Sequence, residues 1–312
     1  MTEEQQVLDT MHRILQRPER VDRTGVGTKS VFGIDMKFSL RNQFPLLTTR
    51  RITLRMIFEE LMWMLRGQTD SKILVEKGVP VWEPNTTREF LDNRGLSDLR
   101  EGDIGNAYGA QYRRFGAQYK GCDYDYGPTL EYLGDRMYHL RKPCGFDQLE
   151  YVINLLQEDP TSRRILMNIW NPSSLHEMSL APCLFCWQFY VDIDEEGVHH
   201  LSAKITQRSS DISLAGGWNI ATGALLVYML SHLLGMQPNE LIWSVGDCHL
   251  YLNQLEGVQT QLRRDPRPFP TLRINTTPSG NSVLERLLNF EWEHFSLENY
   301  NPHPRIKLAM NA

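Results

Sequence analysis

Residues 185–205 read FCWQFYVDIDEEGVHHLSAKI, and this stretch decides the fold. From Phe185 to Ile193 every second side chain is large and apolar, and the alternation resumes from Leu201 to Ile205. A period of two places alternate side chains on one face, which is typical of a strand with one buried side. The turn residues EEG at 195–197 separate the two runs. The stretch therefore predicts an antiparallel hairpin.

The segments around this hairpin predict helices and one further strand. Residues 220–234 are apolar nearly all round, which indicates a buried helix. Apolar residues spaced by three and four positions predict helices at 2–17, 54–66 and 146–157. Alternating apolar and polar residues predict a strand at 34–40. We expect an α+β fold in one domain, residues 1–312, with helices packed on a mixed or antiparallel sheet. Residues 119–145 have weak periodicity and are predicted to form an insertion.

Composition excludes several classes of protein. The 312 residues carry 33 Lys+Arg and 38 Asp+Glu, and a net charge of −5 argues against a dedicated nucleic-acid binder. Apolar runs such as residues 223–230 are far shorter than the ~20 residues of a membrane span, so no membrane partner is expected. Five cysteines, an odd number, fit free thiols in a reducing compartment better than a disulfide framework. The chain is therefore predicted to be soluble and cytoplasmic.

One of these thiols, Cys183, is a candidate nucleophile. Together with Cys186 it has a C-x-x-C spacing, which invites a redox or zinc interpretation. On a strand, however, an offset of three places the two side chains on opposite faces, and a second cysteine pair is missing. We therefore expect no metal site. The alternative to a nucleophile is a small buried hydrophobic side chain, which is the usual role of a free cysteine.

Two neighbouring carboxylates on the helix predicted at 54–66 differ in their surroundings. Glu59 has Arg55 one turn back and is predicted to form an exposed ion pair. Glu60 has apolar residues at 56, 57, 63 and 64, so it projects from an apolar face. Burial there would raise its pKa and let it hold or pass a proton near neutral pH. The alternative is a carboxylate that reaches past this face to a buried arginine or to water.

Four arginines suggest a phosphorylated ligand. Arg23 lies in a glycine-containing loop, Arg163 and Arg164 precede an apolar strand, and Arg208 lies between Gln207 and a serine pair. Guanidinium groups match phosphate oxygens bidentately and stay charged when buried. The alternative is that each arginine forms a separate surface ion pair.

Several motifs, in order along the chain, resemble those of the thymidylate synthase family, whose folate-dependent members use a cysteine nucleophile. They are RTGVGT at 23–28, FPLLTTRR at 44–51, ELMW at 60–63, GDIGNAYG at 102–109, RR at 163–164, LAPC at 180–183, QRSSD at 207–211, GDCHLY at 246–251 and NPHPRIK at 301–307. The resemblance runs from Arg23 to the C-terminus. It implies the family's fold, a sheet-to-sheet homodimer, and methylation of dUMP to dTMP with 5,10-methylenetetrahydrofolate as co-substrate.

The resemblance also implies a role for each candidate residue. Cys183 would add to C6 of uracil, because C5 is a poor nucleophile until a thiolate has added. Arg208 would favour the thiolate and bind phosphate together with Arg23 and with Arg163 and Arg164 of a second subunit. Other implied nucleotide contacts are Ser209, Ser210, Asp211, Asn219, His249 and Tyr251. Proton transfer is assigned to Glu60 and Tyr108, with Asp211 also in the catalytic set, and folate contacts to Trp82, Asn85, Leu180, Asp211, Gly216, Trp218 and Asn311.

Three departures from the family pattern keep an alternative open. Leu184 stands where the family has histidine, residues 215–218 read AGGW where it usually has Gly-x-Pro-Phe, and Asn106-Ala107 replaces Pro-Val. The three departures lie around the expected nucleotide and folate pocket. How well that pocket excludes water determines whether hydride or water adds to the exocyclic methylene intermediate. The alternative is therefore a dUMP hydroxymethylase of the same family, which would release tetrahydrofolate. A non-enzymatic relative with a decayed site is disfavoured, because Cys183 and the residues implied around it are all present.

Overall fold

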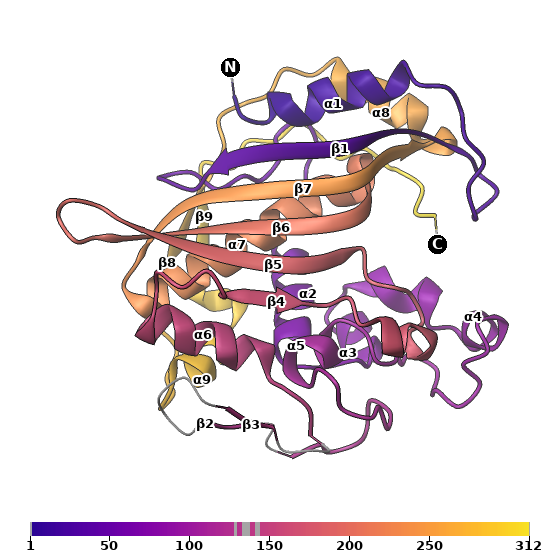
Figure 1. The fold of residues 1–312 in the computed structure, drawn as a ribbon. Helices are drawn as coiled ribbons and strands as arrows, with labels where there is room; N and C mark the ends of the chain where they lie inside the picture. The colour runs from indigo at the N-terminus through magenta and orange to yellow at the C-terminus, as the bar shows by residue number, and fades with distance from the viewer. Residues whose placement is uncertain (1, 128–129, 133–137, 141–143, 312) are drawn as a thin grey trace.

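The computed structural model describes residues 2–127, 130–132, 138–140 and 144–311. The remainder of the insertion predicted at 119–145 lies outside the described residues. The central sheet has five strands in the order β1-β7-β6-β5-β4 (Figure 1). Their bounds are β1 Thr28–Ser39, β4 Leu166–Asn168, β5 Leu184–Ile193, β6 His199–Asp211 and β7 Gln237–Tyr251. Only β6 and β7 pair in parallel, so the sheet is mixed and the predicted α+β class is confirmed.

The predicted hairpin is formed by β5 and β6. Trp187 lies opposite Ile205, Phe189 opposite Ala203 and Val191 opposite Leu201, so the apolar residues of both strands share the buried face. Strand β6 continues past the predicted run to Asp211. This extension carries the QRSSD motif alongside the residues that surround Cys183.

Strand β7 was not predicted from the sequence, although it lies between β1 and β6. Its buried apolar residues alternate from Leu241 to Val245, but the alternation resumes one residue out of step at Cys248 and Leu250. The change of phase occurs at Gly246, where an added Cβ would lie 2.7 Å from the carbonyl oxygen of Arg208. Glycine is needed where the backbones approach so closely, and the broken period hides the strand.

The connection between the parallel strands β6 and β7 is the helix α7, Gly217–Leu234. Parallel neighbours require such a crossover, and the helix packs on both strands. With the preceding π-helical turn it forms a segment of 23 residues, Ile212–Leu234. An 18-residue window of this segment has a mean hydropathy of 1.3, so the segment is long and apolar enough to cross a membrane. The prediction that no apolar stretch reaches that length was wrong. Of that window, 72% is buried inside the described chain, as in the core helix of a soluble protein.

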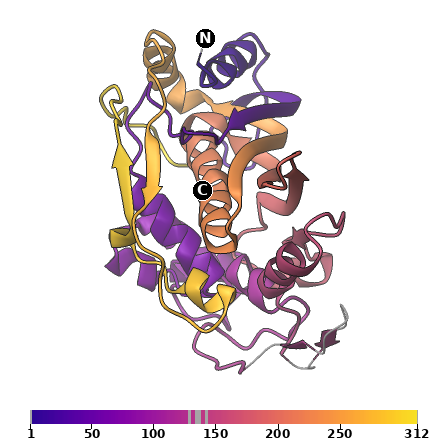
Figure 2. The same ribbon diagram turned by 90° about the vertical axis from the view of Figure 1, so that its left-hand side faces the viewer.

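Most of the remaining elements pack around α7 and the sheet (Figure 2). The helices are α1 Gln5–Leu15, α2 Leu54–Leu65, α3 Lys72–Glu76, α4 Arg88–Asn93, α5 Gly109–Arg113, α6 Gln148–Glu158, α8 Leu255–Leu262 and α9 Val283–Leu288, with 3-10 helices at Pro80–Asn85, Pro172–Glu177, Leu252–Gln254 and Trp292–His294. Two further strand pairs are β2 Leu130–Tyr132 with β3 Tyr138–Leu140, and β8 Thr271–Ile274 with β9 Phe295–Glu298. The helices α1, α2, α3, α5, α6, α8 and α9 and the strands β8 and β9 contribute to the same hydrophobic core as α7 and the sheet.

The second face of the sheet carries exposed apolar side chains. Figure 1 shows β5 and β6 in front of α7, so this face points away from the core helix. Tyr190 of β5 is 65% exposed and Leu166 of β4 is 38% exposed. Leu166 pairs with Gln188, which shares a face with Tyr190, so both apolar residues lie on this surface.

A buried carboxylate, Glu4, joins the start of α1 to the segment before α2. Its two oxygens accept four hydrogen bonds of 2.6–2.8 Å from the backbone N–H and hydroxyl groups of Thr48 and Thr49. Charge-assisted bonds are the stronger class, and here they satisfy the backbone N–H and hydroxyl donors of both buried threonines. Arg50 follows directly, and its guanidinium donates to the Leu214 carbonyl just before α7.

Replacing this carboxylate tests the anchor. Glu4→Gln exchanges one acceptor oxygen for an NH₂ donor that faces Thr48 or Thr49. We expect the free energy of unfolding to fall by about 2 kcal/mol, measured by urea denaturation. The exposed Glu19→Gln is the matched control and should change it by less than about 0.5 kcal/mol. Equal stability of the two variants would contradict the anchoring role.

Candidate active site

Two adjoining cavities of about 240 and 270 Å³ open between α2, the ends of β5 and β6, α7 and the C-terminal segment. Cys183 and Asn219 line both of them, and we call the two together the active-site cleft. The structure brings most of the predicted site residues to this cleft. They are Arg23, Glu60, Trp82, Asn85, Tyr108, Leu180, Cys183, Arg208, Ser209, Ser210, Asp211, Trp218, Asn219, His249, Tyr251 and Asn311.

Cys183 immediately precedes β5 and lies beside Arg208 of β6. The backbone N–H of Arg208 donates to the Cys183 carbonyl at 2.9 Å, and Nη2 of Arg208 lies 3.7 Å from Sγ. The guanidinium is held by the carbonyls of Ala181 and Pro182, each at 2.9 Å. Burial raises the pKa of the Cys183 thiol, while the positive charges of Arg208 and Arg23 oppose that rise. The free thiol is thus kept mostly protonated beside a cation that favours the thiolate.

Glu60 lies on α2 at the far end of the cleft, between two tryptophans. Oε1 accepts from Nε1 of Trp82 at 2.8 Å and Oε2 accepts from Nε1 of Trp218 at 2.6 Å. Burial raises the pKa of Glu60, and the two indole hydrogen bonds act in the opposite direction. The predicted rise in pKa is therefore confirmed in direction.

The neighbouring carboxylate, Glu59, differs from the prediction. It is buried and forms an ion pair of 2.5 Å with Lys77 instead of an exposed pair with Arg55. Because α2 is buried over most of its circumference, both carboxylates are shielded from solvent. Each is therefore paired with a polar group from another element.

Tyr108 precedes α5 with an uncommon positive φ of 25°. Its hydroxyl oxygen accepts from the backbone N–H of Cys183 at 2.9 Å, and its ring meets Trp82 edge-on at 5.3 Å. Burial raises the pKa of Tyr108 well above its ordinary value, so the phenol stays protonated. The same loop contains Gly105, where an added Cβ would lie 1.9 Å from the carbonyl oxygen of Glu177. Only glycine fits this approach.

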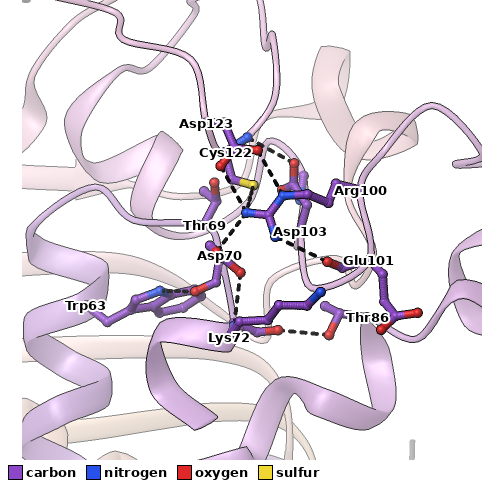
Figure 3. Close-up of polar contacts among 12 residues, drawn as sticks. Trp63, Thr69, Asp70, Lys72, Thr86, Arg100, Glu101, Asp103, Cys122 and Asp123 are labelled. Atoms are coloured by element: carbon purple, nitrogen blue, oxygen red, sulfur yellow. Dashed lines mark hydrogen bonds and ion pairs between the residues drawn. The ribbon is translucent and has the colours of Figure 1, made fainter. Parts of the chain in front are cut away.

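A network of polar side chains around Asp103 and Arg100 joins the start of the Tyr108 loop to the segment that contains Cys122 (Figure 3). Asp103 accepts from the Gly105 N–H at 2.8 Å, from the Tyr119 hydroxyl at 2.6 Å and from the Cys122 N–H at 3.0 Å. Arg100 adds ion pairs to Asp70 at 2.7 Å and to Asp123 at 2.9 Å. The first residues of the predicted insertion are therefore bonded to the loop that carries Tyr108.

The other cavity is lined by the polar residues of β6 and β7. Ser209 Oγ lies 3.5 Å from Nδ1 of His249, whose ring meets Tyr251 edge-on at 5.1 Å. Within the described part of the chain, Ser210 Oγ and Nδ2 of Asn85 are buried without a hydrogen-bond partner. Buried polar atoms seldom stay unpaired, so these two groups are suited to contact a bound ligand.

Asp211 organises the end of β6. Oδ1 accepts from the backbone N–H groups of Ser213 and Leu214, and Oδ2 accepts from Nε2 of Gln254 at 2.7 Å. The same Nε2 donates to the Ala309 carbonyl at 2.7 Å. Asp211 thus links the π-helical turn before α7 to the C-terminal segment, which brings Asn311 to the cleft.

Three predicted residues do not line the cleft. Arg163 and Arg164 are exposed in the turn before β4, and Gly216 is buried against Trp243. Conversely, Arg50 and Gln207 were not singled out from the sequence. Buried Arg50 donates to the Leu214 carbonyl at 2.8 Å, and burial lowers its pKa to about 10 while the Asp211 carboxylate counteracts the fall.

Gln207, a buried residue, lines both cavities. It lies two positions before Ser209 on β6, and that spacing was the available signal. Among the residues that the structure describes, no group of three or more His, Cys, Asp or Glu side chains is arranged to hold a metal ion.

Comparison with known proteins gives consistent matches over the whole chain. The family described as thymidylate synthase matches residues 5–312. Thymidylate synthase from Homo sapiens is 43% identical over 308 residues, which cover 98% of this chain and 90% of that protein. The proteins of that name from Agaricus bisporus and Saccharomyces cerevisiae are 43% and 42% identical, over 100% and 99% of this chain and 100% and 97% of theirs.

The proximity of Arg208 to Cys183 predicts thiol reactivity. Because the cation lowers the pKa of this thiol, Arg208→Gln should raise it and slow alkylation by iodoacetamide about tenfold near neutral pH. Peptide-resolved mass spectrometry over a pH series measures the rate at Cys183. Cys122, which is also half-buried but lies beside Arg100 at 3.1 Å, is the internal control and should alkylate at an unchanged rate. An unaltered Cys183 rate would show that Arg208 does not act on the thiol.

Proposed function

Since the chain belongs to the thymidylate synthase family, we propose that it methylates dUMP reductively to dTMP, with 5,10-methylenetetrahydrofolate as co-substrate and dihydrofolate as second product. The observation that carries this proposal is the arrangement of one cleft. Its Cys183 thiol lies beside the Arg208 cation, and the buried carboxyl of Glu60 lies at the other end. A nucleophile and a proton-transfer group in one partly dry cavity suit covalent chemistry on a pyrimidine ring.

The residues of the cleft would divide the reaction between them. Cys183 would lose its proton and add to C6 of uracil, and the resulting C5 carbanion would attack the methylene carbon of the folate. Loss of the C5 proton would then break the bond from that methylene to the folate nitrogen and leave an exocyclic methylene on the ring. Hydride from the folate would add to this methylene and expel the Cys183 thiolate from C6, which gives dTMP and dihydrofolate. Tyr108, whose hydroxyl is bonded to the backbone of Cys183, would assist removal of the C5 proton, and Glu60 would exchange protons at the base and folate. Asn219 has an amide that can both donate to O4 and accept from N3–H.

The phosphate end of the proposed site would draw on a second copy of the chain. Arg208 and Arg23 line the cleft, whereas Arg163 and Arg164 are exposed outside it, which leaves them free to contribute to a partner's site. The exposed apolar side chains of Tyr190 and Leu166 support pairing through the outer sheet face. We therefore propose a sheet-to-sheet homodimer in which each subunit lends two arginines to the other.

The remaining expectations follow from the same premise. Residues 1–312 would form a single catalytic domain with an insertion at 119–145, and the enzyme would work in the cytoplasm without a membrane or nucleic-acid partner. The relatives reported above are all named thymidylate synthase, so a hydroxymethylase, in which water replaces hydride, is not favoured.

Product analysis tests the reaction. Incubation of the enzyme with dUMP and 5,10-methylenetetrahydrofolate should yield dTMP and dihydrofolate in equal amounts, followed by absorbance and by the mass of the nucleotide. Cys183→Ala should abolish turnover while leaving dUMP binding largely intact, because only the covalent step is lost. A hydroxymethyl nucleotide without dihydrofolate would overturn the synthase assignment.

Mixing two impaired variants tests the shared site. Cys183→Ala and the double variant Arg163→Ala/Arg164→Ala should each have little activity alone. Random pairing makes half of the dimers mixed, and each mixed dimer has one intact site, so about a quarter of wild-type activity should return. The separate variants at the same concentrations are the controls. If no activity returns on mixing, the arginines do not act across an interface.

A further inference from the structure

Each oxygen of the Glu60 carboxylate is held by a different tryptophan. Trp82 belongs to the 3-10 helix Pro80–Asn85, and Trp218 lies in the first turn of α7. Their indole N–H groups donate to Oε1 and Oε2 at 2.8 and 2.6 Å, so the carboxylate joins three separate elements. Such a clamp allows one orientation of the carboxyl plane.

The donor chemistry of this clamp selects one protonation state. An indole N–H can only donate, and both carboxylate oxygens accept when Glu60 is ionised. Once a proton is added, one oxygen becomes a hydroxyl and accepts more weakly, so part of the clamp is lost. Hydrogen bonds to the charged form favour that form, in opposition to the burial that disfavours it.

We propose that Trp218 is a positioning residue for proton transfer, which holds Oε2 of Glu60 and sets its protonation, in addition to lining the cavity. The inference rests on the proposed function, which makes Glu60 a proton-transfer group. Trp218 is one of the departures from the family pattern, because phenylalanine is usual at its position. A phenyl ring would fill similar space without an N–H donor, so this chain has one more hydrogen bond to its buried carboxylate.

The direction of the effect follows from the opposing contributions. Burial raises the pKa of Glu60, and the hydrogen bonds from Trp218 and Trp82 lower it. Loss of the Trp218 donor leaves the burial contribution in place, so the pKa should rise further. Whichever limb of the pH–rate profile reports Glu60 must then move to higher pH.

The experiment compares the wild-type enzyme with Trp218→Phe. Difference infrared spectroscopy follows the carboxylic-acid carbonyl band over a pH series, and Glu60→Gln identifies the band by its disappearance. The midpoint should rise by about one pH unit in Trp218→Phe, as expected for loss of one charge-assisted hydrogen bond. The corresponding limb of the kcat profile should move by the same amount.

The matched control is Trp187→Phe. Trp187 lines the same cavity, and its indole N–H donates to the Tyr112 hydroxyl at 2.7 Å and not to Glu60. Its removal should leave the Glu60 midpoint in place. If phenylalanine at 218 impairs folding, the benzothiophene analogue of tryptophan at 218 preserves the ring shape and removes only the donor.

The outcomes separate the alternatives. A midpoint that rises with Trp218→Phe or with the analogue, and not with Trp187→Phe, supports the proposal. An unchanged midpoint with a higher KM for the folate would mean that Trp218 only lines the pocket, and this result would overturn the proposal. Equal shifts in both variants would also overturn it, since general repacking would then be the cause. If the wild-type enzyme made no dTMP, the proposed function would fail while the infrared titration still tested the clamp.

Discussion

The backbone hydrogen bond from Arg208 to Cys183 is the constraint on which the active site depends. It continues the pairing of β5 with β6 by one residue beyond Leu184 and Gln207, past a register shift between Leu184 and Cys186, so the end of one hairpin places a guanidinium beside a thiol. A slip of one residue would turn Arg208 to the opposite face and remove the charge from the nucleophile. The buried apolar pairs along the hairpin prevent that slip. Core packing therefore determines the electrostatics of Cys183.

The cleft combines this rigid frame with low solvation. Burial raises the pKa of Cys183, Glu60 and Tyr108 alike, and the neighbours of the thiol and of the carboxyl oppose that rise. The neighbours differ: a cation for the thiol and indole donors for the carboxyl. One cavity can thus support nucleophilic and proton-transfer roles, because the local partner of each group shifts its pKa. Hydrogen-bond networks outside the cleft also hold its loops in place. Asp103, for example, accepts hydrogen bonds from Gly105, Tyr119 and Cys122.

Much of the fold could be predicted where the hydrophobic period was intact. The hairpin, α7, α2 and α6 all follow from runs with a steady period of two or three to four. The sequence did not reveal β7, because the phase changes at Gly246, nor the first half of β1, where Gly33 and polar residues interrupt the pattern. Most site residues came from motifs, but Arg50 and Gln207 did not stand out. Their importance arises from burial beside Asp211 and the cavities, which no local pattern encodes.

By itself the sequence determined the chemical inventory of this protein: a thiol before an amphipathic hairpin, a carboxyl on an apolar helix face, and arginines in loops. These are local properties, since spacing along the chain settles which side chains share a face. Only the tertiary structure decided that Glu59 pairs with Lys77, and that Glu60 is bonded to tryptophans 22 and 158 residues away. Hydrogen bonds and pKa shifts depend on distances of a few ångströms between segments that packing brings together, and that packing involves the whole core.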